Sequence, residues 1–351
     1  MTIHPDAIYA ILAAILFGLA TPVAKLLISD VSPQMLAGLL YAGSGLGLFL
    51  LYGFTRLFQR DNHERLPIQA PDLPWLLGAI VCGGVLGPVL LMQGLLSTPA
   101  SMASLLLNLE SVLTALLAWF IFKEHFDRRI LIGMASIVCG SLLLSWPKHL
   151  NTAFPWGAVA IAGACACWAI DNNLTRKISA NDALQIACIK GLVAGFVNLA
   201  IALSLGKALP DFSAGVSAAI IGFLGYGVSL VLFVISLRHI GTARTGAYFS
   251  AAPFAGVICS FLLLHEQPDG LFWAAMVLMI IGVWLHLTEH HAHLHYHREL
   301  RHQHIHSHDE HHQHTHDFDW DGSEPHVHPH EHMALSHSHQ HFPDLHHQHK
   351  H

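Results

Sequence analysis

The sequence predicts an all-α membrane protein: ten transmembrane helices in two inverted five-helix repeats, plus a disordered His-rich cytoplasmic tail. Only 11% of the 351 residues are charged and 53% are hydrophobic, whereas soluble domains carry about 25% charged residues. The apolar residues gather in long segments, and 24 of the 31 histidines lie beyond residue 288. This composition excludes a soluble globular protein. It also excludes a nucleic-acid binder, which needs a basic surface.

The predicted membrane body consists of ten apolar segments. A helix needs about 20 mostly apolar residues to cross a bilayer. Because the backbone finds no water in lipid, each segment must satisfy its own hydrogen bonds as a helix. The ten segments lie near residues 7–27, 33–55, 73–94, 98–121, 130–146, 155–174, 182–205, 214–237, 242–264 and 268–288.

Positive charge in the short loops predicts the orientation. Cytoplasmic loops carry an excess of Lys and Arg. Loops after even-numbered segments hold ten such residues, and loops after odd-numbered segments hold three. We therefore expect both termini and the tail in the cytoplasm, with the chain in the inner membrane.

An internal repeat relates the two halves of this body. Residues 105–126 align without gaps to residues 247–268, which pairs Glu124 with Glu266. Each half holds five segments, and an odd number inverts the second half relative to the first. Inverted repeats with a site near the midplane recur in transporters. We expect the parts of the chain at residues 1–146, 153–288 and 289–351.

These features resemble the drug/metabolite transporter superfamily in its ten-helix form with two EamA-type domains. The resemblance covers about residues 7–288. It rests on the two five-helix halves, on the acidic residue closing the fourth helix of each (Glu124 and Glu266), and on the Trp-rich helix leading into DNNLTRK at 171–177. The resemblance implies the fold and a transport activity, and it leaves the substrate open. It does not imply an enzyme.

Glu110 is the strongest candidate site residue. It lies about 18 Å along its predicted helix at about 1.5 Å per residue, close to the bilayer centre, where a carboxylate is costly and marks a functional site. Such a group can bind a proton or a cation alternately, or it pairs with a lysine to hold helices together. Asn108 lies on the opposite side of the same helix. It shares a stripe with Ser101, Ser104 and Ser111, which either lines a pathway or packs against another helix.

A second candidate cluster consists of Asp171, Asn172 and Asn173, nearer the cytoplasmic side. Carboxylate and amide oxygens suit a divalent cation entering from inside. Alternatively, these residues mark a helix end at the membrane interface. Lys190 lies at a similar depth and needs a partner, either Asp171 or Glu110, in a structural or a switching ion pair.

The tail resembles that of nickel and cobalt exporters within the superfamily. Its low apolar content cannot form a packed core, so we expect it to be disordered without metal. Neutral imidazole binds divalent Ni, Co and Zn. A pH sensor, a purification tag and neutral drift are the alternatives. The predicted metal ligands are His290, His291, His293, His295, His297, His302, His304, His306, His308, His311, His312, His314, His316, His326, His328, His330 and His332.

The predicted function is secondary-active efflux of a divalent transition metal, nickel or cobalt, which gives metal resistance. The tail would collect, buffer or gate the metal. The first alternative is export of an amino-acid-like metabolite, with the tail regulating it by metal binding. A membrane-anchored metal buffer is another. No cofactor is required, since no phosphate-binding Gly-rich loop is present. The bilayer and metal ions are the expected partners, and close glycine pairs also allow a homodimer.

Overall fold

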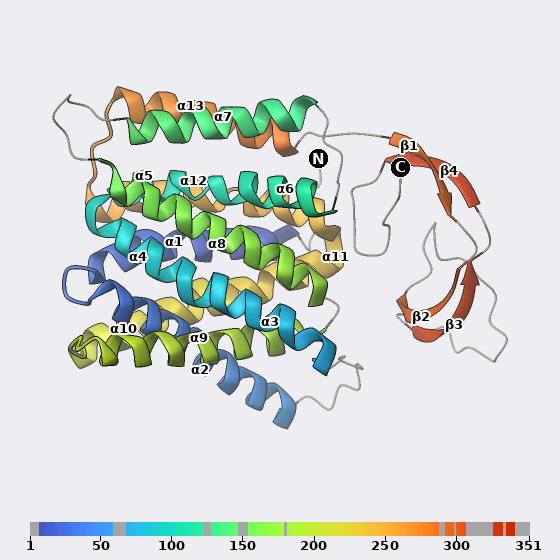
Figure 1. Ribbon diagram of the computed structural model, residues 1–351, viewed down its shortest axis with the longest axis horizontal. Helices are drawn as coiled ribbons and strands as arrows, with labels where there is room; N and C mark the ends of the chain where they lie inside the picture. Colours follow the sequence, from blue (N-terminus) through green and yellow to red (C-terminus); the bar gives the residue numbers. More distant parts are fainter. Residues whose placement is uncertain are drawn as a thin grey trace. The chain divides into compact units, whose positions relative to one another are not determined.

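The structure is a computed structural model of the chain (Figure 1). The chain divides into two units, residues 1–289 and 290–351, which are described separately. The structure describes residues 7–58, 68–122, 128–146, 154–178, 181–287, 292–297, 300–306, 326–332 and 335–340.

The first unit is helical, which confirms the predicted all-α body. All ten predicted spans fall on helices. Seven helical stretches in the described part are long and apolar enough to cross a membrane. The α-helices are α1 (Ala7–Leu27), α2 (Pro33–Phe58), α3 (Leu73–Ala79), α4 (Gly87–Ser97), α5 (Ala100–Leu106), α6 (Leu109–Phe122), α7 (Arg128–Ser145), α8 (Trp156–Ile178), α9 (Ala183–Ser204), α10 (Phe212–Ile221), α11 (Ser229–Phe249), α12 (Ala252–Leu264) and α13 (Gly270–Leu287).

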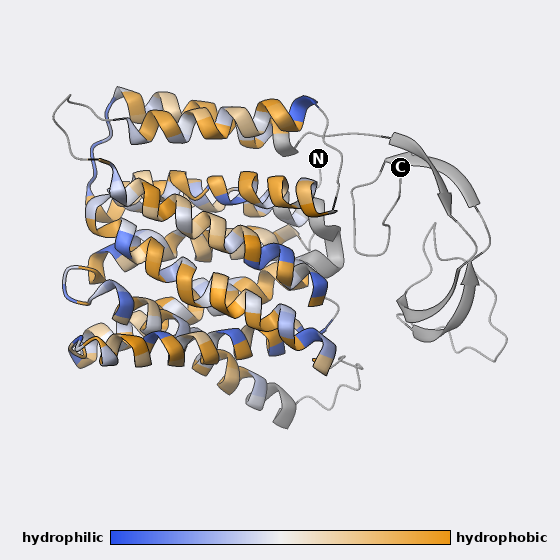
Figure 2. Ribbon diagram, in the orientation of Figure 1, coloured by the Kyte–Doolittle hydropathy of each residue, from blue (hydrophilic) through white to orange (hydrophobic). Residues whose placement is uncertain are grey.

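The outer surface of this unit is apolar. Phe196, Phe120 and Leu50 are each more than 70% exposed, and large apolar side chains exposed in such numbers mark a surface that lipid covers. Figure 2 shows apolar residues along most of each helix, with hydrophilic ones mainly near the ends. The first unit is therefore a multi-pass membrane protein body.

Small residues bring the helices close together. A Cβ on Gly45 of α2 would lie 2.3 Å from the backbone nitrogen of Leu192 in α9. A Cβ on Gly195 would lie 2.4 Å from the nitrogen of Ala42. Helices in lipid associate through such close packing. These glycines are thus used inside the chain, whereas the homodimer stays a prediction.

Two predicted span boundaries are wrong. The segment predicted as one helix over 98–121 is interrupted at Leu107–Asn108, between α5 and α6. The connection predicted between 237 and 242 lies inside α11, and the chain leaves the helix at Ser250–Ala251 instead. One glycine in a helix costs about 1 kcal/mol, so Gly241 and its polar neighbours do not end a helix whose backbone hydrogen bonds continue.

Two segments with π-helical hydrogen bonding interrupt the bundle: η2 (Ile80–Leu86) between α3 and α4, and η3 (Gly222–Val228) between α10 and α11. The alignment that pairs Glu124 with Glu266 places η2 on η3. It also pairs Gly140 with Gly282, and these two glycines pack α7 against α13. The element bounds follow the sequence repeat, while its inverted arrangement in the membrane stays a prediction.

In the second unit the structure describes four short strands, and the disorder of the metal-free tail stays a prediction. Strand β1 (Ala292–His297) pairs antiparallel with β4 (Leu335–Gln340), and β2 (Leu300–His306) pairs antiparallel with β3 (His326–His332). Histidine alternating with another residue has the two-residue period of a strand. The predicted ligands on strands are His293, His295, His297, His302, His304, His306, His326, His328, His330 and His332. The others, His290, His291, His308, His311, His312, His314 and His316, lie outside the described residues.

Candidate functional site

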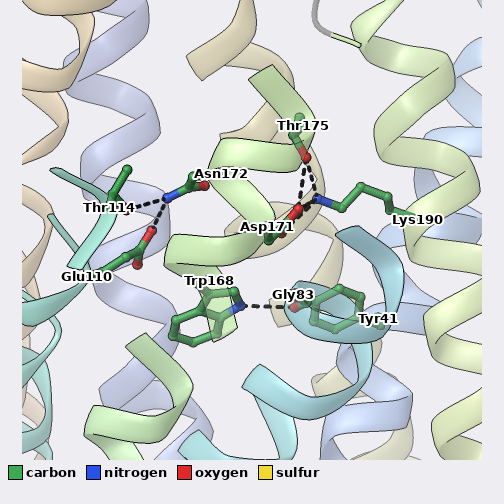
Figure 3. A network of polar contacts seen from close by, with 9 residues as sticks. All are labelled: Tyr41, Gly83, Glu110, Thr114, Trp168, Asp171, Asn172, Thr175 and Lys190. Carbon is green, nitrogen blue, oxygen red and sulfur yellow. Dashed lines mark hydrogen bonds and ion pairs between the residues drawn. The ribbon is translucent and has the colours of Figure 1, made fainter. Parts of the chain in front are cut away.

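The candidate site is built around α8, which carries polar side chains on two of its faces. Figure 3 shows Asn172 directed toward Glu110 and Thr114 of α6, and Asp171 directed toward Lys190 of α9. Consecutive residues of a helix do not share a face, so adjacent polar residues on α8 serve two different neighbours.

The first face carries a buried ion pair. Both carboxylate oxygens of Asp171 accept from the Lys190 Nζ, at 2.6 and 2.8 Å. The Thr175 hydroxyl donates to the same carboxylate at 2.8 Å. Asp171 and Lys190 are each 7% exposed. Of the two partners predicted for Lys190, the structure therefore selects Asp171, and each charge compensates the other.

The ion pair fits against η2 only because residue 83 is glycine. A Cβ on Gly83 would lie 1.8 Å from Asp171 Oδ2, far inside any allowed contact. The carbonyl of Gly83 also accepts two side-chain hydrogen bonds, from the Tyr41 hydroxyl at 2.7 Å and from the Trp168 Nε1 at 3.0 Å (Figure 3). Gly83 belongs to the π-helical segment η2. Such segments within helices are frequent at functional sites.

The second face carries Glu110, in the first turn of α6. The Asn172 Nδ2 donates to Glu110 Oε1 at 2.8 Å and lies 3.4 Å from the Thr114 hydroxyl. Glu110 is half-buried and Asn172 is exposed. In the described part of the chain Glu110 forms no ion pair. The two residues, predicted in separate clusters, therefore form one polar pair that is only partly buried.

Asn108 and Asn173 do not join this pair. The buried Asn108 amide donates to the Leu105 carbonyl at 3.0 Å and lies 3.9 Å from the sulfur of Met279. Asn173 donates to the Ala169 carbonyl at 2.8 Å and to the Thr114 carbonyl at 3.3 Å. Both amides are used in satisfying buried backbone groups, as buried polar groups must be.

The interruption between α5 and α6 is locally stabilised. The Leu107 nitrogen donates to both the Ala103 and Ser104 carbonyls, and the Ser111 hydroxyl donates to the Asn108 carbonyl at 2.8 Å. Helix ends need such partners. In many transporters the substrate site is formed where a spanning helix is discontinuous, and Glu110 lies directly after this interruption.

An aromatic cluster also belongs to this region, and sequence reasoning missed it. Phe17 of α1 lies 6.3 Å from Trp168, 5.9 Å from Tyr226 and 5.5 Å from Phe249, measured between ring centroids. Tyr41 lies 5.5 Å from Tyr226. These residues come from five different helical segments, and aromatic residues are common in apolar spans, so only the tertiary structure identifies them as a group.

At one end of the body, the charged side chains of Glu266 and Lys25 each bind the backbone at the end of another helix. The Glu266 carboxylate accepts from the backbone nitrogens of Ala100 at 2.7 Å and Ser101 at 2.9 Å, at the start of α5. The Lys25 Nζ donates to the carbonyls of Leu95 and Thr98 at the end of α4. Both contacts match the helix dipole, which favours anions at the N-terminus and cations at the C-terminus. Glu124, paired with Glu266 in the repeat, lies outside the described residues.

The predicted divalent-metal mouth is not assembled as expected, since Asp171 is paired with Lys190 and Asn173 binds backbone. Among the described residues whose side chains are placed, no group of three or more His, Cys, Asp or Glu could hold a metal ion. The side chains of the tail histidines are not part of that description.

A helical membrane body with interrupted helices around a polar site is typical of membrane transporters. The EamA-like transporter family matches residues 5–146 and 155–288, and the chain belongs to this family. A solved crystal structure with 18% identity has a TM-score of 0.59 and covers 81% of this chain and 98% of its own. This likeness shows the fold.

Curated relatives carry transporter names. An "Uncharacterized transporter" of Methanothermobacter thermautotrophicus is 28% identical over 78% of this chain and 84% of its own length. A "Probable amino-acid metabolite efflux pump" of Salmonella typhimurium is 24% identical over 80% of this chain and 94% of its own. A "Probable terminal-alkyne amino-acid exporter" of Streptantibioticus cattleyicolor is 25% identical over 62% of this chain and 74% of its own length.

Proposed function

We propose that the protein exports an amino-acid-like organic metabolite across the inner membrane. The observation that carries this proposal is the Glu110–Asn172 pair, in which a partly exposed carboxylate has no ion-pair partner in the described residues. Intramembrane carboxylates of this kind mark substrate or ion pathways. The names of relatives in Salmonella and Streptantibioticus support export of amino-acid-like compounds.

The proposed mechanism is secondary-active alternating access by two inverted halves, with both termini in the cytoplasm. The interruption before Glu110 and the matching interruption at Ser250–Ala251 support it, because discontinuous helices surround the sites of such transporters. The change between the two access states would require helices to bend. The π-helical segments η2 and η3 would be the hinges, since mid-helix interruptions often act in this way.

Efflux of nickel or cobalt is the second candidate, and the His-rich tail is the observation that favours it. In the first proposal the same tail binds metal and regulates the exporter. Flexible histidine sites release metal as the pH falls through about 6.5, because protons compete for imidazole. In both candidate functions, metal binding by the tail histidines is part of the proposal.

Uptake by everted membrane vesicles tests the two candidates together. Vesicles containing the full chain should accumulate labelled phenylalanine under a proton gradient and should not accumulate labelled nickel above empty vesicles. Accumulation of nickel without any amino compound would overturn the proposal. A chain lacking residues 289–351 should transport phenylalanine at the rate of the full chain in metal-free buffer, and it should lose any response to added nickel.

Glu110→Gln tests the role of the site in the same vesicles. The amide retains the size of the side chain and removes the charge, so we expect uptake to fall at least about tenfold, the equivalent of about 1.4 kcal/mol. Asp30→Asn is the matched control, because Asp30 is an exposed carboxylate in the turn between α1 and α2. Equal uptake by both variants would remove Glu110 from the pathway.

A further inference from the structure

The charges near the site are unevenly compensated, and this asymmetry points to the substrate. Asp171 and Lys190 compensate each other through two contacts of 2.6 and 2.8 Å. Glu110 receives one hydrogen bond, from the neutral amide of Asn172. A carboxylate in a low-dielectric region without a cation is costly, so an incoming positive charge would be stabilised there.

Glu110 lies at a partly exposed position. Asn172, its hydrogen-bond partner, is exposed, and Glu110 itself is half-buried. Ser111, the next residue of α6, is exposed as well. By contrast, both residues of the Asp171–Lys190 pair on the other face of α8 are buried.

Among the side chains that the structure places near Glu110, three groups that could bind a substrate carboxylate already have partners. The Lys190 ammonium is held by Asp171 and also lies 3.4 Å from the Thr175 hydroxyl. The indole nitrogen of Trp168 and the hydroxyl of Tyr41 both donate to the carbonyl of Gly83. A cationic side chain that recognises a carboxylate must be available for it, and Lys190 is not.

The aromatic cluster is partly exposed: Phe17, Tyr41 and Phe249 are half-buried, whereas Trp168 and Tyr226 are buried. Trp168 lies one helical turn before Asn172 on α8, and residues at that spacing are neighbours on one face. The rings of Phe17, Tyr226 and Phe249 continue from it. Aromatic rings bury apolar groups and attract organic ammonium ions through their faces.

We propose that Glu110 binds the protonated amine of the exported compound, that the aromatic cluster binds its apolar part, and that a substrate carboxylate is not required. This inference rests on the proposed export function and narrows its substrate class to primary amines with an apolar body. One carboxylate and one neutral amide suit a single positive charge. A transition-metal ion prefers several imidazole or thiolate ligands.

Binding to the purified full-length protein in detergent tests the inference without requiring transport. The probes are phenylalanine, phenethylamine, which lacks the carboxylate, and N-acetylphenylalanine, which lacks the charged amine. In titration calorimetry we expect phenethylamine to bind at least as tightly as phenylalanine, and N-acetylphenylalanine to show no binding. Tighter binding of the acetylated compound than of phenethylamine would overturn the inference.

Variants of the same residue complete the test. Glu110→Gln should weaken phenethylamine binding about tenfold to a hundredfold, the usual range for losing a hydrogen bond to a charged group, and Asp30→Asn should leave it unchanged. Glu110→Asp keeps the charge and should retain the preference for phenethylamine over N-acetylphenylalanine, even if its affinity falls. An unchanged affinity in a folded Glu110→Gln protein would refute the assignment.

The binding and transport results separate the two proposals. If phenethylamine binds through Glu110 but no amino compound crosses the vesicle membrane, the export function fails and the amine site stands. If phenylalanine is transported while phenethylamine neither binds nor competes, export stands and the inference fails.

Discussion

The two faces of α8 place similar residues in opposite electrostatic situations. Asp171 is buried and fully paired with Lys190, whereas Glu110, facing Asn172 on the other side, is partly exposed and hydrogen-bonded to a neutral amide. Both carboxylates lie within predicted membrane spans, where either would attract attention by sequence alone. The difference teaches that an intramembrane carboxylate is identified as a binding group by its partners and accessibility.

Lys190→Met is expected to have the largest effect on stability. It leaves Asp171 buried without a compensating charge, and breaking a buried pair in this way costs about 3–5 kcal/mol. Thermal unfolding in detergent measures the loss. The double variant Asp171→Asn, Lys190→Met should recover most of it, and equal destabilisation of the single and double variants would contradict a compensated pair.

Gly83→Ala should cause the second-largest loss of stability, because the added methyl group would collide with the same ion pair. The new Cβ would lie 1.8 Å from Asp171 Oδ2, and Asp171 is held in place by Lys190. Overpacking of this kind costs about 1–3 kcal/mol. Gly53→Ala is the control, because a Cβ there meets nothing within 4 Å. The same unfolding assay should show loss of stability only in the first variant.

Thr175→Val compares the two faces through matched threonines. It removes the 2.8 Å hydrogen bond to Asp171 and should cost about 1 kcal/mol. Thr114→Val on the Glu110 side removes only a 3.4 Å contact with Asn172, so its unfolding temperature should stay closer to wild type. A reversed order would mean that the Glu110 face carries the structural role.

Glu110→Gln should have the smallest effect on stability, despite its large expected effect on binding and uptake. Replacing a carboxylate that has no ion-pair partner in the described residues by an amide relieves a desolvation cost, so the unfolding temperature should not fall. This outcome would sharpen the contrast with Lys190→Met. A loss of stability as large as that of Lys190→Met would make Glu110 a structural residue.

Much of the candidate site could be predicted from the sequence. Ionisable residues inside apolar spans pointed to Glu110, Asp171 and Lys190, and the requirement for a partner made Asp171 one of two choices for Lys190. Helical spacing predicted Asn108 on the opposite side from Glu110, but it assumed one unbroken helix, and the structure has an interruption at Leu107–Asn108. Helical spacing could not show that Asn172 contacts Glu110, because the two lie on α8 and α6, far apart in the chain.

The interruption at Leu107–Asn108 was not predictable from local signals. Leucine and asparagine there differ little from their neighbours in helix propensity, which spans only about 0.7 kcal/mol for ordinary residues. A local hydrogen bond from the Asn108 amide to the Leu105 carbonyl accompanies the break, and the same amide lies 3.9 Å from the sulfur of Met279, which is remote in sequence.

By itself, the sequence determined that this chain is a helical membrane protein with a repeat and a chemically distinct tail, because apolar length and loop charge act locally along the chain. Only the tertiary structure decided which intramembrane charges compensate each other, which aromatic rings gather, and that residue 83 must be glycine. Those outcomes depend on distances between helices remote in sequence, and no local pattern encodes such distances.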